Sequence, residues 1–280
     1  MKKVILVVSF GTTFADTRKK TIDVVEDKIR ANFPEYEVRR AYTAHIIINR
    51  LKKRDNIHID TPEEALQKLM DENYDEVIVQ PLHIIPGLEY DYIKAVVSRF
   101  RHKRFFKKLS LGRPALFFKG GENAPDDYEI FVEAIEEHLN KEDKFVLMGH
   151  GTAHHANACY ACLQQVLGDK GYGNVYIGNV EGYPEIPVII DKLIQDEVNQ
   201  VTLKPLMLVS GDHARNDMVG HDEDSWQNQL ARQGIQSEAD MRSLGEIGTF
   251  QDIYVQHVED AIKGTYDKIG VSRKIKRILV

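Results

Sequence analysis

Short apolar runs and longer stretches with helical periodicity alternate along this chain. In its first part, the apolar run KVILVVSF ends in a Gly-Thr-Thr loop, and an amphipathic pattern follows from about Arg18 to Phe33. A strand-like run over Val38–Tyr42 comes next. It is followed by a helical stretch that Thr61 can cap, with Pro62 at its first position. The apolar run EVIVQPLHII then returns to strand character. This alternation predicts a mostly parallel sheet with helices on both faces.

The second part of the chain repeats the pattern of the first. Three pairs of segments match in the same order: SFGTT from Ser9 with GHGTA from Gly149, QPLHIIPG from Gln80 with KPLMLVSG from Lys204, and SLGRPALF from Ser110 with SLGEIGTF from Ser243. We therefore predict an α/β protein with two similar doubly wound parallel-sheet domains and a cleft between them. The turn-forming segment 120–125 separates an N-terminal domain, residues 1–124, from a C-terminal domain, residues 125–280.

The matched strand ends carry groups that can bind metals or move protons. His150 follows the apolar run KFVLM, and Phe10 holds the matching place in the first half. His213 lies just past KPLMLVSGD, and its match is Glu89, just past QPLHIIPGL. Ligands of open parallel sheets bind beyond the carboxyl ends of the strands, so two facing sheets would bring these positions into one cleft. His150, His213 and Glu89 are therefore the candidate catalytic residues.

Glu181 is a further candidate, because it ends the strand-like run NVYIGNV and should border the same cleft. His150, Glu181 and His213 would form a metal site in the C-terminal domain with nitrogen and oxygen ligands. Such a site suits Co²⁺, Ni²⁺, Fe²⁺ or Zn²⁺ and does not select among them. Ordinary polar loop residues are the alternative interpretation, but two histidines at equivalent strand ends favour a shared site.

The other histidines are expected to be mainly structural. His83 lies within the apolar run PLHIIP and is expected to be a core histidine with its hydrogen bonds satisfied. His154 and His155 begin a predicted helix. Their side chains are expected either to line the cleft or to face solvent, and the sequence favours neither. Charged surroundings favour the surface for five others: His58, His102, His138, His221 and His257.

The motif formed by Cys159 and Cys162, a CxxC, could indicate redox chemistry or a zinc site. The pair falls inside a predicted helix, and no second cysteine pair supplies the further ligands of a structural zinc site. Helix packing is therefore the favoured interpretation, and two cysteines give no disulfide framework.

The composition excludes several functional classes. A formal net charge of −6 argues against nucleic acid and anionic membranes as partners, since either needs a basic face. No apolar run approaches the roughly 20 residues of a membrane span. The segment from Met1 to Thr13 resembles a weak secretory signal, but its apolar run is short and ends like a strand-to-helix loop. We therefore expect a cytoplasmic protein.

Motifs for phosphate binding and for serine nucleophiles are missing from the sequence. It holds no GxxxxGK[ST] loop and no GxGxxG fingerprint, so no nucleotide cofactor is expected. It also lacks a GxSxG elbow, which counts against a hydrolase.

Five segments together resemble the anaerobic cobalt chelatases of cobalamin synthesis, the CbiK type of sirohydrochlorin cobaltochelatase. They are VSFGTTFADTR near the N-terminus, PLHIIPGLEYD from Pro81, GHGTAHHANACYACL from Gly149, GNVEGYP from Gly178 and PLMLVSGDHARNDMVG from Pro205. The resemblance spans nearly the whole chain. It implies a class II chelatase with a fold shared with ferrochelatase. It also implies insertion of Co²⁺ into sirohydrochlorin or precorrin-2, without ATP, between the two domains.

The resemblance also implies roles for the candidate residues. His150 in GHGT and His213 in SGDHARND match the paired metal-binding and catalytic histidines of that family. Glu89 in PGLEYD matches an acidic residue at the metal in some members, and Glu181 in NVEGYP matches an acidic ligand in others. Fe²⁺ or Ni²⁺ as the natural metal, a non-catalytic metal- or tetrapyrrole-binding protein, and a homo-oligomer remain open alternatives.

Overall fold

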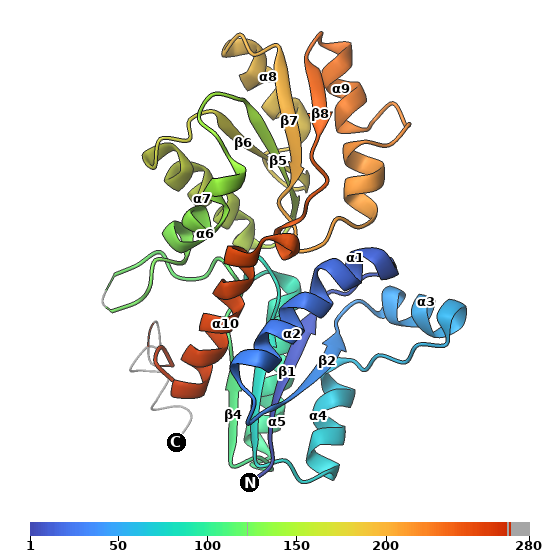
Figure 1. Ribbon diagram of the computed structural model, residues 1–280, viewed down its shortest axis with the longest axis vertical. Coiled ribbons are helices and arrows are strands. Elements are labelled where there is room, and N and C mark those ends of the chain that lie inside the picture. Colours follow the sequence, from blue (N-terminus) through green and yellow to red (C-terminus); the bar gives the residue numbers. More distant parts are fainter. Residues whose placement is uncertain (122, 268, 270–280) are drawn as a thin grey trace.

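The computed structural model describes residues 1–121, 123–267 and 269, and its two halves each contain a four-stranded sheet (Figure 1). The strand order is β2-β1-β3-β4 in the first half and β6-β5-β7-β8 in the second, and every named strand pair is parallel. Helices cover both faces of each sheet, which confirms the predicted pair of doubly wound α/β units. The strands are β1 (Lys3–Ser9), β2 (Glu37–Tyr42), β3 (Glu76–Pro81), β4 (Lys108–Leu111), β5 (Phe145–Gly151), β6 (Val175–Glu181), β7 (Gln200–Pro205) and β8 (Gln236–Ala239).

The helices alternate with these strands along the chain. Three of the short segments are 3₁₀-helical and one, η3, is π-helical: η1 (Glu136–His138), η2 (His155–Asn157), η3 (Ala214–Met218) and η4 (Leu244–Glu246). The α-helices are α1 (Ala15–Lys20), α2 (Ile22–Asn32), α3 (His45–Asp55), α4 (Pro62–Asp71), α5 (Leu88–His102), α6 (Asp127–Ile135), α7 (Ala158–Asp169), α8 (Ile186–Gln195), α9 (Trp226–Arg232) and α10 (Gly248–Lys263). Within the described residues, no helix combines the length and the apolar character that crossing a membrane requires.

Local sequence explains most of these boundaries. Thr61 caps α4 in a full capping box with Glu64, as its position before Pro62 predicts. The helix expected from Arg18 to Phe33 is instead two helices that meet at Thr21. The hydroxyl of Thr21 donates to the carbonyl of Thr17 at 2.7 Å, and its backbone leaves the helical region. This local side-chain bond competes with helix continuation, which the apolar pattern alone does not reveal.

The strand registers show which residues of the two halves are equivalent. Glu76 of β3 and Gln200 of β7 open matching ladders, so Glu89 corresponds to His213 as predicted. The pairings of β1 with β3 and of β5 with β7 likewise make Phe10 of the first half the structural equivalent of His150 in the second.

The third sequence match proves to be wrong. Ser110 lies inside β4, whereas Ser243 lies beyond β8 and caps η4. The hydrogen bonds fix the true equivalence, because Ala115 donates to the carbonyl of His83 and Leu244 donates to that of Met207. The shared letters SLG are therefore not structurally equivalent.

The helix α10 departs from a simple division of the chain at residue 124. It follows the second half in sequence, yet it packs against α2 and β3 of the first half and against α6 (Figure 1). One hydrophobic cluster consequently holds residues of both halves, among them Ile22, Phe131 and Tyr254, beside a separate cluster in each half. The predicted boundary between 1–124 and 125–280 remains a prediction, and residues 122, 268 and 270–280 lie outside the described residues.

The expected surface position of His257 is wrong. Its ring is buried in α10, with Nδ1 3.0 Å from the carbonyl of Arg113 and Nε2 3.5 Å from Asp127. Arg113 also pairs with Asp127 and with Asp260, so a buried charged cluster joins the end of the first sheet, α6 and α10. Asp260, a charged neighbour of His257 in the sequence, belongs to this buried network, whereas Glu259 forms a largely exposed pair with Lys263.

Candidate functional site

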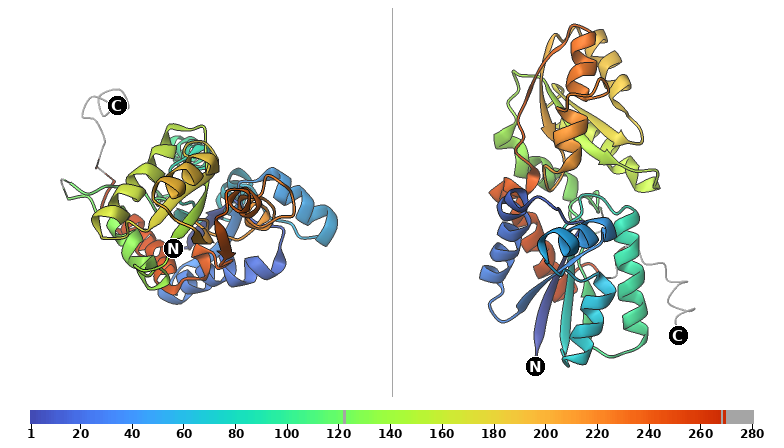
Figure 2. Two further views of the ribbon diagram at one scale, coloured as in Figure 1. Left: turned by 90° about the horizontal axis from the view of Figure 1, so that it is seen from above. Right: turned by 90° about the vertical axis from the view of Figure 1, so that its right-hand side faces the viewer.

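The carboxyl ends of the two sheets face each other where the halves meet (Figures 1 and 2). Side chains join the halves there. Arg215 follows β7 and donates to Asp16 at 3.1 Å and to Thr17 at 3.2 Å, with its guanidinium 4.1 Å from the centroid of the Phe14 ring. These contacts tie the strand-end loops of the second half to α1 of the first.

A second contact between the halves joins His154 and Asp91. The Nε2 atom of His154 lies 3.2 Å from Oδ2 of Asp91 in α5. The backbone N–H of Ala156 donates to Nδ1 of the same ring, which leaves the ring proton on Nε2 to be donated to the carboxylate. His154 therefore lies between the halves, while its neighbour His155 is exposed.

The two central candidates, His150 and His213, are brought together between the halves. Their rings meet edge to face, with centroids 4.6 Å apart and an angle of 86° between the planes. Both side chains are half-buried. His150 is the penultimate residue of β5, a strand buried on both faces, and His213 immediately precedes the π-helical segment η3. Short π-helical segments are rare and often occur at functional sites.

The Nδ1 atoms of both rings face oxygen acceptors. Nδ1 of His150 lies 3.1 Å from the carbonyl of Gly151, and Nδ1 of His213 lies 2.5 Å from Oδ2 of Asp217. A carbonyl or a carboxylate can only accept, so the proton of each neutral ring belongs on Nδ1. The Nε2 lone pairs are then available to a metal ion or to a proton.

The two acidic candidates flank the histidines less directly. Glu181 is exposed at the end of β6, where its backbone pairs in register with Gly151. Glu89 is half-buried in the first turn of α5. Among residues 1–121, 123–267 and 269, no three or more His, Cys, Asp or Glu side chains are grouped closely enough to hold a metal ion. The structure thus assembles the histidine pair, whereas the His150–Glu181–His213 set is not gathered into a ready-made metal site.

The ring nitrogens of His83 are buried, as expected for a core histidine, but their hydrogen bonds are not satisfied. Neither ring nitrogen has a hydrogen-bond partner among the described residues, and burial lowers the pKa of His83 to about 4. It is therefore a neutral imidazole in an apolar setting over the physiological pH range.

The cysteine pair lies closer to the start of its helix than the sequence predicted, since α7 begins at Ala158 and follows the 3₁₀ turn η2. Both thiols are free and half-buried, and burial raises the pKa of Cys159 and of Cys162. A raised pKa disfavours the reactive thiolate, so the packing interpretation stands.

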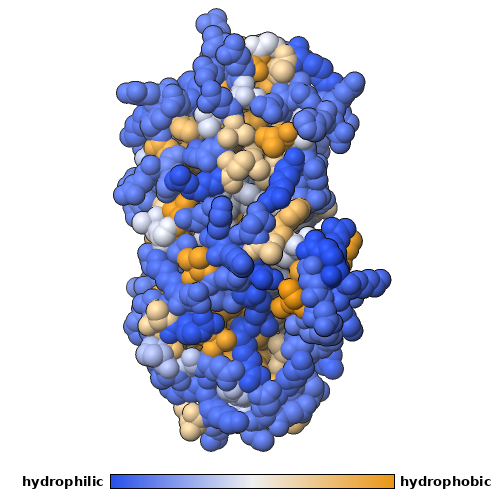
Figure 3. All heavy atoms as spheres, turned by 45° about the vertical axis from the view of Figure 1, so that its right-hand side comes forward, coloured by the Kyte–Doolittle hydropathy of each residue, from blue (hydrophilic) through white to orange (hydrophobic). Residues whose placement is uncertain are grey.

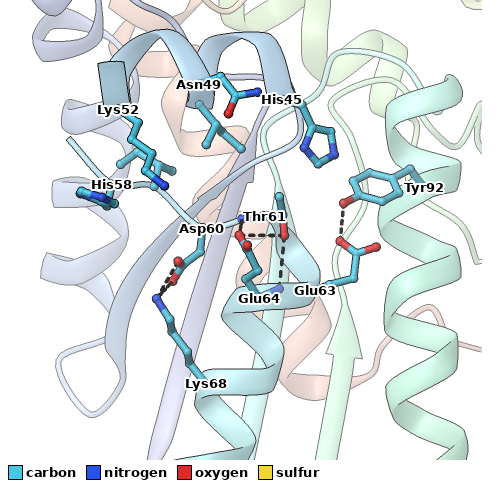
Figure 4. A pocket seen from close by; sticks show the side chains of 12 residues that line it. His45, Asn49, Lys52, His58, Asp60, Thr61, Glu63, Glu64, Lys68 and Tyr92 are labelled. Atoms are coloured by element: carbon cyan, nitrogen blue, oxygen red, sulfur yellow. Dashed lines mark hydrogen bonds and ion pairs between the residues drawn. The ribbon is translucent and has the colours of Figure 1, made fainter. Parts of the chain in front are cut away.

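A separate cavity of about 470 Å³ opens in the first half among α3, α4 and α5 (Figure 4). Its carboxylates already have partners: Asp60 pairs with Lys68, Glu64 closes the cap of Thr61, and Glu63 accepts from Tyr92. None of the predicted site residues lines this cavity.

Several large apolar side chains are exposed at the same strand ends as the histidines. Phe10 follows β1, Leu88 is the first residue of α5, and Tyr183 follows β6, with exposed fractions of 44%, 61% and 70%. On the face drawn in Figure 3, hydrophobic residues lie in small groups among hydrophilic ones. Apolar side chains at the edge that carries the two histidines suit a ligand with a broad flat apolar surface.

Asp217, Asp91 and Arg215 are site residues that the sequence did not single out. Asp217 could have been found, because it lies four residues after His213, a spacing at which helical side chains meet. Asp91 and Arg215 bind across the two halves, and no local spacing reveals such contacts.

The fold and the facing strand ends define the class of protein, a two-domain α/β chelatase fold. The sirohydrochlorin chelatase SirB from Bacillus subtilis subspecies spizizenii, solved in complex with cobalt, superimposes with a TM-score of 0.65 at 12% identity. The alignment covers 96% of this chain and 98% of SirB.

Sequence comparison is more specific. Residues 3–263 match the family described as Cobalt chelatase (CbiK). The chain is 41% identical over 265 residues to a sirohydrochlorin cobaltochelatase of Salmonella typhimurium, covering 94% of this chain and 97% of that protein. It is 34% identical over 274 residues to the sirohydrochlorin cobaltochelatase CbiKC of Nitratidesulfovibrio vulgaris, covering 95% of this chain and 93% of that protein. This chain therefore belongs to the CbiK cobalt chelatase family.

Proposed function

We propose that this protein inserts Co²⁺ into sirohydrochlorin, or into its precursor precorrin-2, as a step of anaerobic cobalamin synthesis in the cytoplasm. The observation that carries the proposal is the edge-to-face pair of His150 and His213, whose Nε2 atoms have no hydrogen-bond partner in the part of the chain that the structure describes. The names of the two relatives, at 41% and 34% identity over nearly the whole chain, support this substrate and this metal.

The chemistry exchanges one Co²⁺ ion for the two pyrrole protons of the ring. A hydrated ion must lose water, and the protons must be accepted as the metal–nitrogen bonds form. Neutral imidazoles suit both tasks, since an Nε2 lone pair can bind a borderline divalent ion or take a proton. In this proposal His150 and His213 hold the ion beside the ring. His150 accepts one pyrrole proton once its Nε2 has released the ion, and Glu89 takes the other. The reaction consumes no nucleotide, because the metal–nitrogen bonds themselves supply the driving force.

Glu181 and Glu89 complete the proposed site from opposite halves. Glu181 ends the strand beside that of His150, which supports it as the nearer of the two glutamates to an ion held by the histidines. Glu89 occupies the position in the first half that His213 occupies in the second, which supports a place for it on the opposite side of the ring. We therefore assign Glu181 to the metal and Glu89 to proton removal. The exposed Phe10, Leu88 and Tyr183 would contact the flat apolar face of the macrocycle.

An anaerobic absorbance assay tests this function. Purified protein is mixed with sirohydrochlorin and, in turn, with Co²⁺, Fe²⁺ and Ni²⁺, without nucleotide. We expect many metallated rings per protein chain, with Co²⁺ the preferred ion. Metallation that stops at one ring per chain would identify a carrier instead. Faster turnover with Fe²⁺ or Ni²⁺ would reassign the metal, and a requirement for ATP would contradict the nucleotide-free reaction.

A further inference from the structure

We propose that Asp217 is a positioning residue that makes His213 the stronger of the two imidazole ligands, so that Co²⁺ stays on His213 while His150 is exchanged for ring nitrogens. This inference rests on the proposed roles of the two histidines. Its starting point is the short contact of 2.5 Å between Nδ1 of His213 and Oδ2 of Asp217.

The two rings have unequal partners. The Nδ1–H of His213 points at a carboxylate, which carries a full negative charge, whereas that of His150 points at the neutral carbonyl of Gly151 at 3.1 Å. A hydrogen bond to a charged acceptor is about twice as strong as one between neutral groups. It also pushes electron density toward Nε2 and strengthens the bond from that atom to a metal. Two chemically identical side chains therefore differ as ligands.

The π-helical segment η3 holds Asp217 in place. Ala214 and Met218 of this segment are fully buried in the core of the second half. His213 and Asp217 each precede one of these two buried residues, so the same anchoring fixes both side chains. Arg215, on the same segment, binds Asp16 and Thr17 of the first half.

No competing role is visible for the Asp217 carboxylate. Within the described residues, His213 is its only hydrogen-bond or ion-pair partner. The side chain is 43% exposed, so it does not fill a core. The contact with His213 is therefore the role that the structure offers for the Asp217 carboxylate.

A Co²⁺ titration of the whole protein, followed by the visible d–d absorption of the bound ion under anaerobic conditions, tests the proposal. We expect Asp217→Asn to bind Co²⁺ about 10- to 100-fold more weakly, the usual cost of losing such a partner. The KM for Co²⁺ should rise by a similar factor, with a smaller change in kcat. Asp217→Glu, which keeps the carboxylate, should recover part of the affinity. Asp212→Asn is the matched control, since Asp212 is an exposed acid beside His213 without a hydrogen-bond partner among the described residues, and it should behave as wild type.

His213→Ala in the same titration separates the two proposals. If His213→Ala loses Co²⁺ binding and Asp217→Asn binds as wild type, the positioning role is overturned and the proposed site stands. If His213→Ala itself binds Co²⁺ as wild type, the site is overturned. Long-range ¹H–¹⁵N spectra of the metal-free wild type give a readout that needs no variant. They should show the proton of neutral His213 on Nδ1, and a proton on Nε2 would refute the proposal.

Discussion

A Cβ atom on Gly151 would lie 1.6 Å from the backbone oxygen of Glu181, because the two residues pair directly across β5 and β6. The φ of Gly151 is +73°, a backbone conformation that residues with a Cβ atom rarely adopt. Gly151→Ala must therefore spread the two strands that carry His150 and Glu181. We expect a loss of at least about 2 kcal/mol in the free energy of unfolding, together with loss of chelatase activity. Urea unfolding and the metallation assay measure these.

Gly168 provides the control for that substitution. It lies in α7, and a Cβ there would meet nothing within 4 Å. Gly168→Ala should raise the free energy of unfolding by about 0.5–1 kcal/mol, because alanine favours the helix. A Gly151→Ala protein with wild-type stability and activity would refute the steric argument.

His150→Ala and His213→Ala should each abolish or nearly abolish cobalt insertion. Each loss should exceed the roughly 10²–10⁴-fold that proton transfer alone explains, because the same side chain also holds the ion. Anaerobic initial rates measure the loss. Circular dichroism should show an intact fold, since both rings are only half-buried, one near the carboxyl end of β5 and the other just before η3. His221→Ala, at an exposed position, is the matched control and should retain full activity. A folded double variant that inserts cobalt at the wild-type rate contradicts the mechanism.

The two glutamates should respond differently to amide substitution. Glu181→Gln should weaken Co²⁺ binding about 10-fold or more, since an amide oxygen is a poorer ligand for a divalent ion than a carboxylate. Glu89→Gln should mainly lower kcat, with little effect on Co²⁺ affinity in the absence of the ring. Co²⁺ titration and steady-state kinetics separate the two effects. A cobalt-soaked crystal with Glu89 on the metal and Glu181 remote would reverse the assignment.

The exposed aromatic residues should contribute to ring binding. Phe10→Ser and Tyr183→Ser should each raise the KM for sirohydrochlorin about 10-fold, since covering an aromatic side chain is worth about 1.5–3 kcal/mol. Fluorescence quenching by the tetrapyrrole gives the affinity directly. Phe105→Ser is the control, because Phe105 is 51% exposed but precedes β4, at the opposite edge of the first sheet. Equal effects of Phe10→Ser and Phe105→Ser would rule out a ring-binding role for Phe10.

The buried cluster around Asp127 should make the fold sensitive to acid. Burial raises the pKa of Asp127, but hydrogen bonds from His257 and Arg113 lower it further, so the folded pKa lies below the ordinary 3.8. A carboxylate with a depressed pKa contributes its full stability above the unfolded pKa and loses it as the pH falls through the folded one. Asp127→Asn should therefore cost about 3 kcal/mol at neutral pH, and the difference from wild type should shrink below about pH 4.

Unfolding in urea at pH 7 and at pH 3.5 or so measures this difference. Asp252→Asn is the control. Asp252 pairs with Lys28, but its side chain is largely exposed, and exposed ion pairs contribute only about 0–1 kcal/mol to the free energy of unfolding. A constant difference between wild type and Asp127→Asn over this pH range would show that the ionised carboxylate is not the source of the stability.

The strand ends and their equivalence were predictable because buried parallel strands such as β1 and β5 are continuous apolar runs with recognisable loops after them. The proximity of His150 and His213 followed from that geometry. The burial of His257 and the false match at Ser243 depend on contacts between distant segments, which local patterns do not contain. The break at Thr21 comes from a local bond to Thr17, which the apolar periodicity does not reveal. Asp217 was visible in the sequence, but the π-helical turn that directs it at His213 was not.

The position of α10 determines when the first half can finish folding during synthesis. Strands β1 to β4 emerge from the ribosome well before α10, yet Phe250 and Tyr254 of that helix complete the shared core, and the hydroxyl of Tyr254 donates to the carbonyl of Leu82 at 3.1 Å. Until α10 is made, the surfaces of α2 and β3 beneath it remain in contact with water. The half of the protein that is translated first therefore cannot reach its final packing until nearly the whole chain has been made, and a nascent chain stalled before Gly248 would carry an uncovered apolar face.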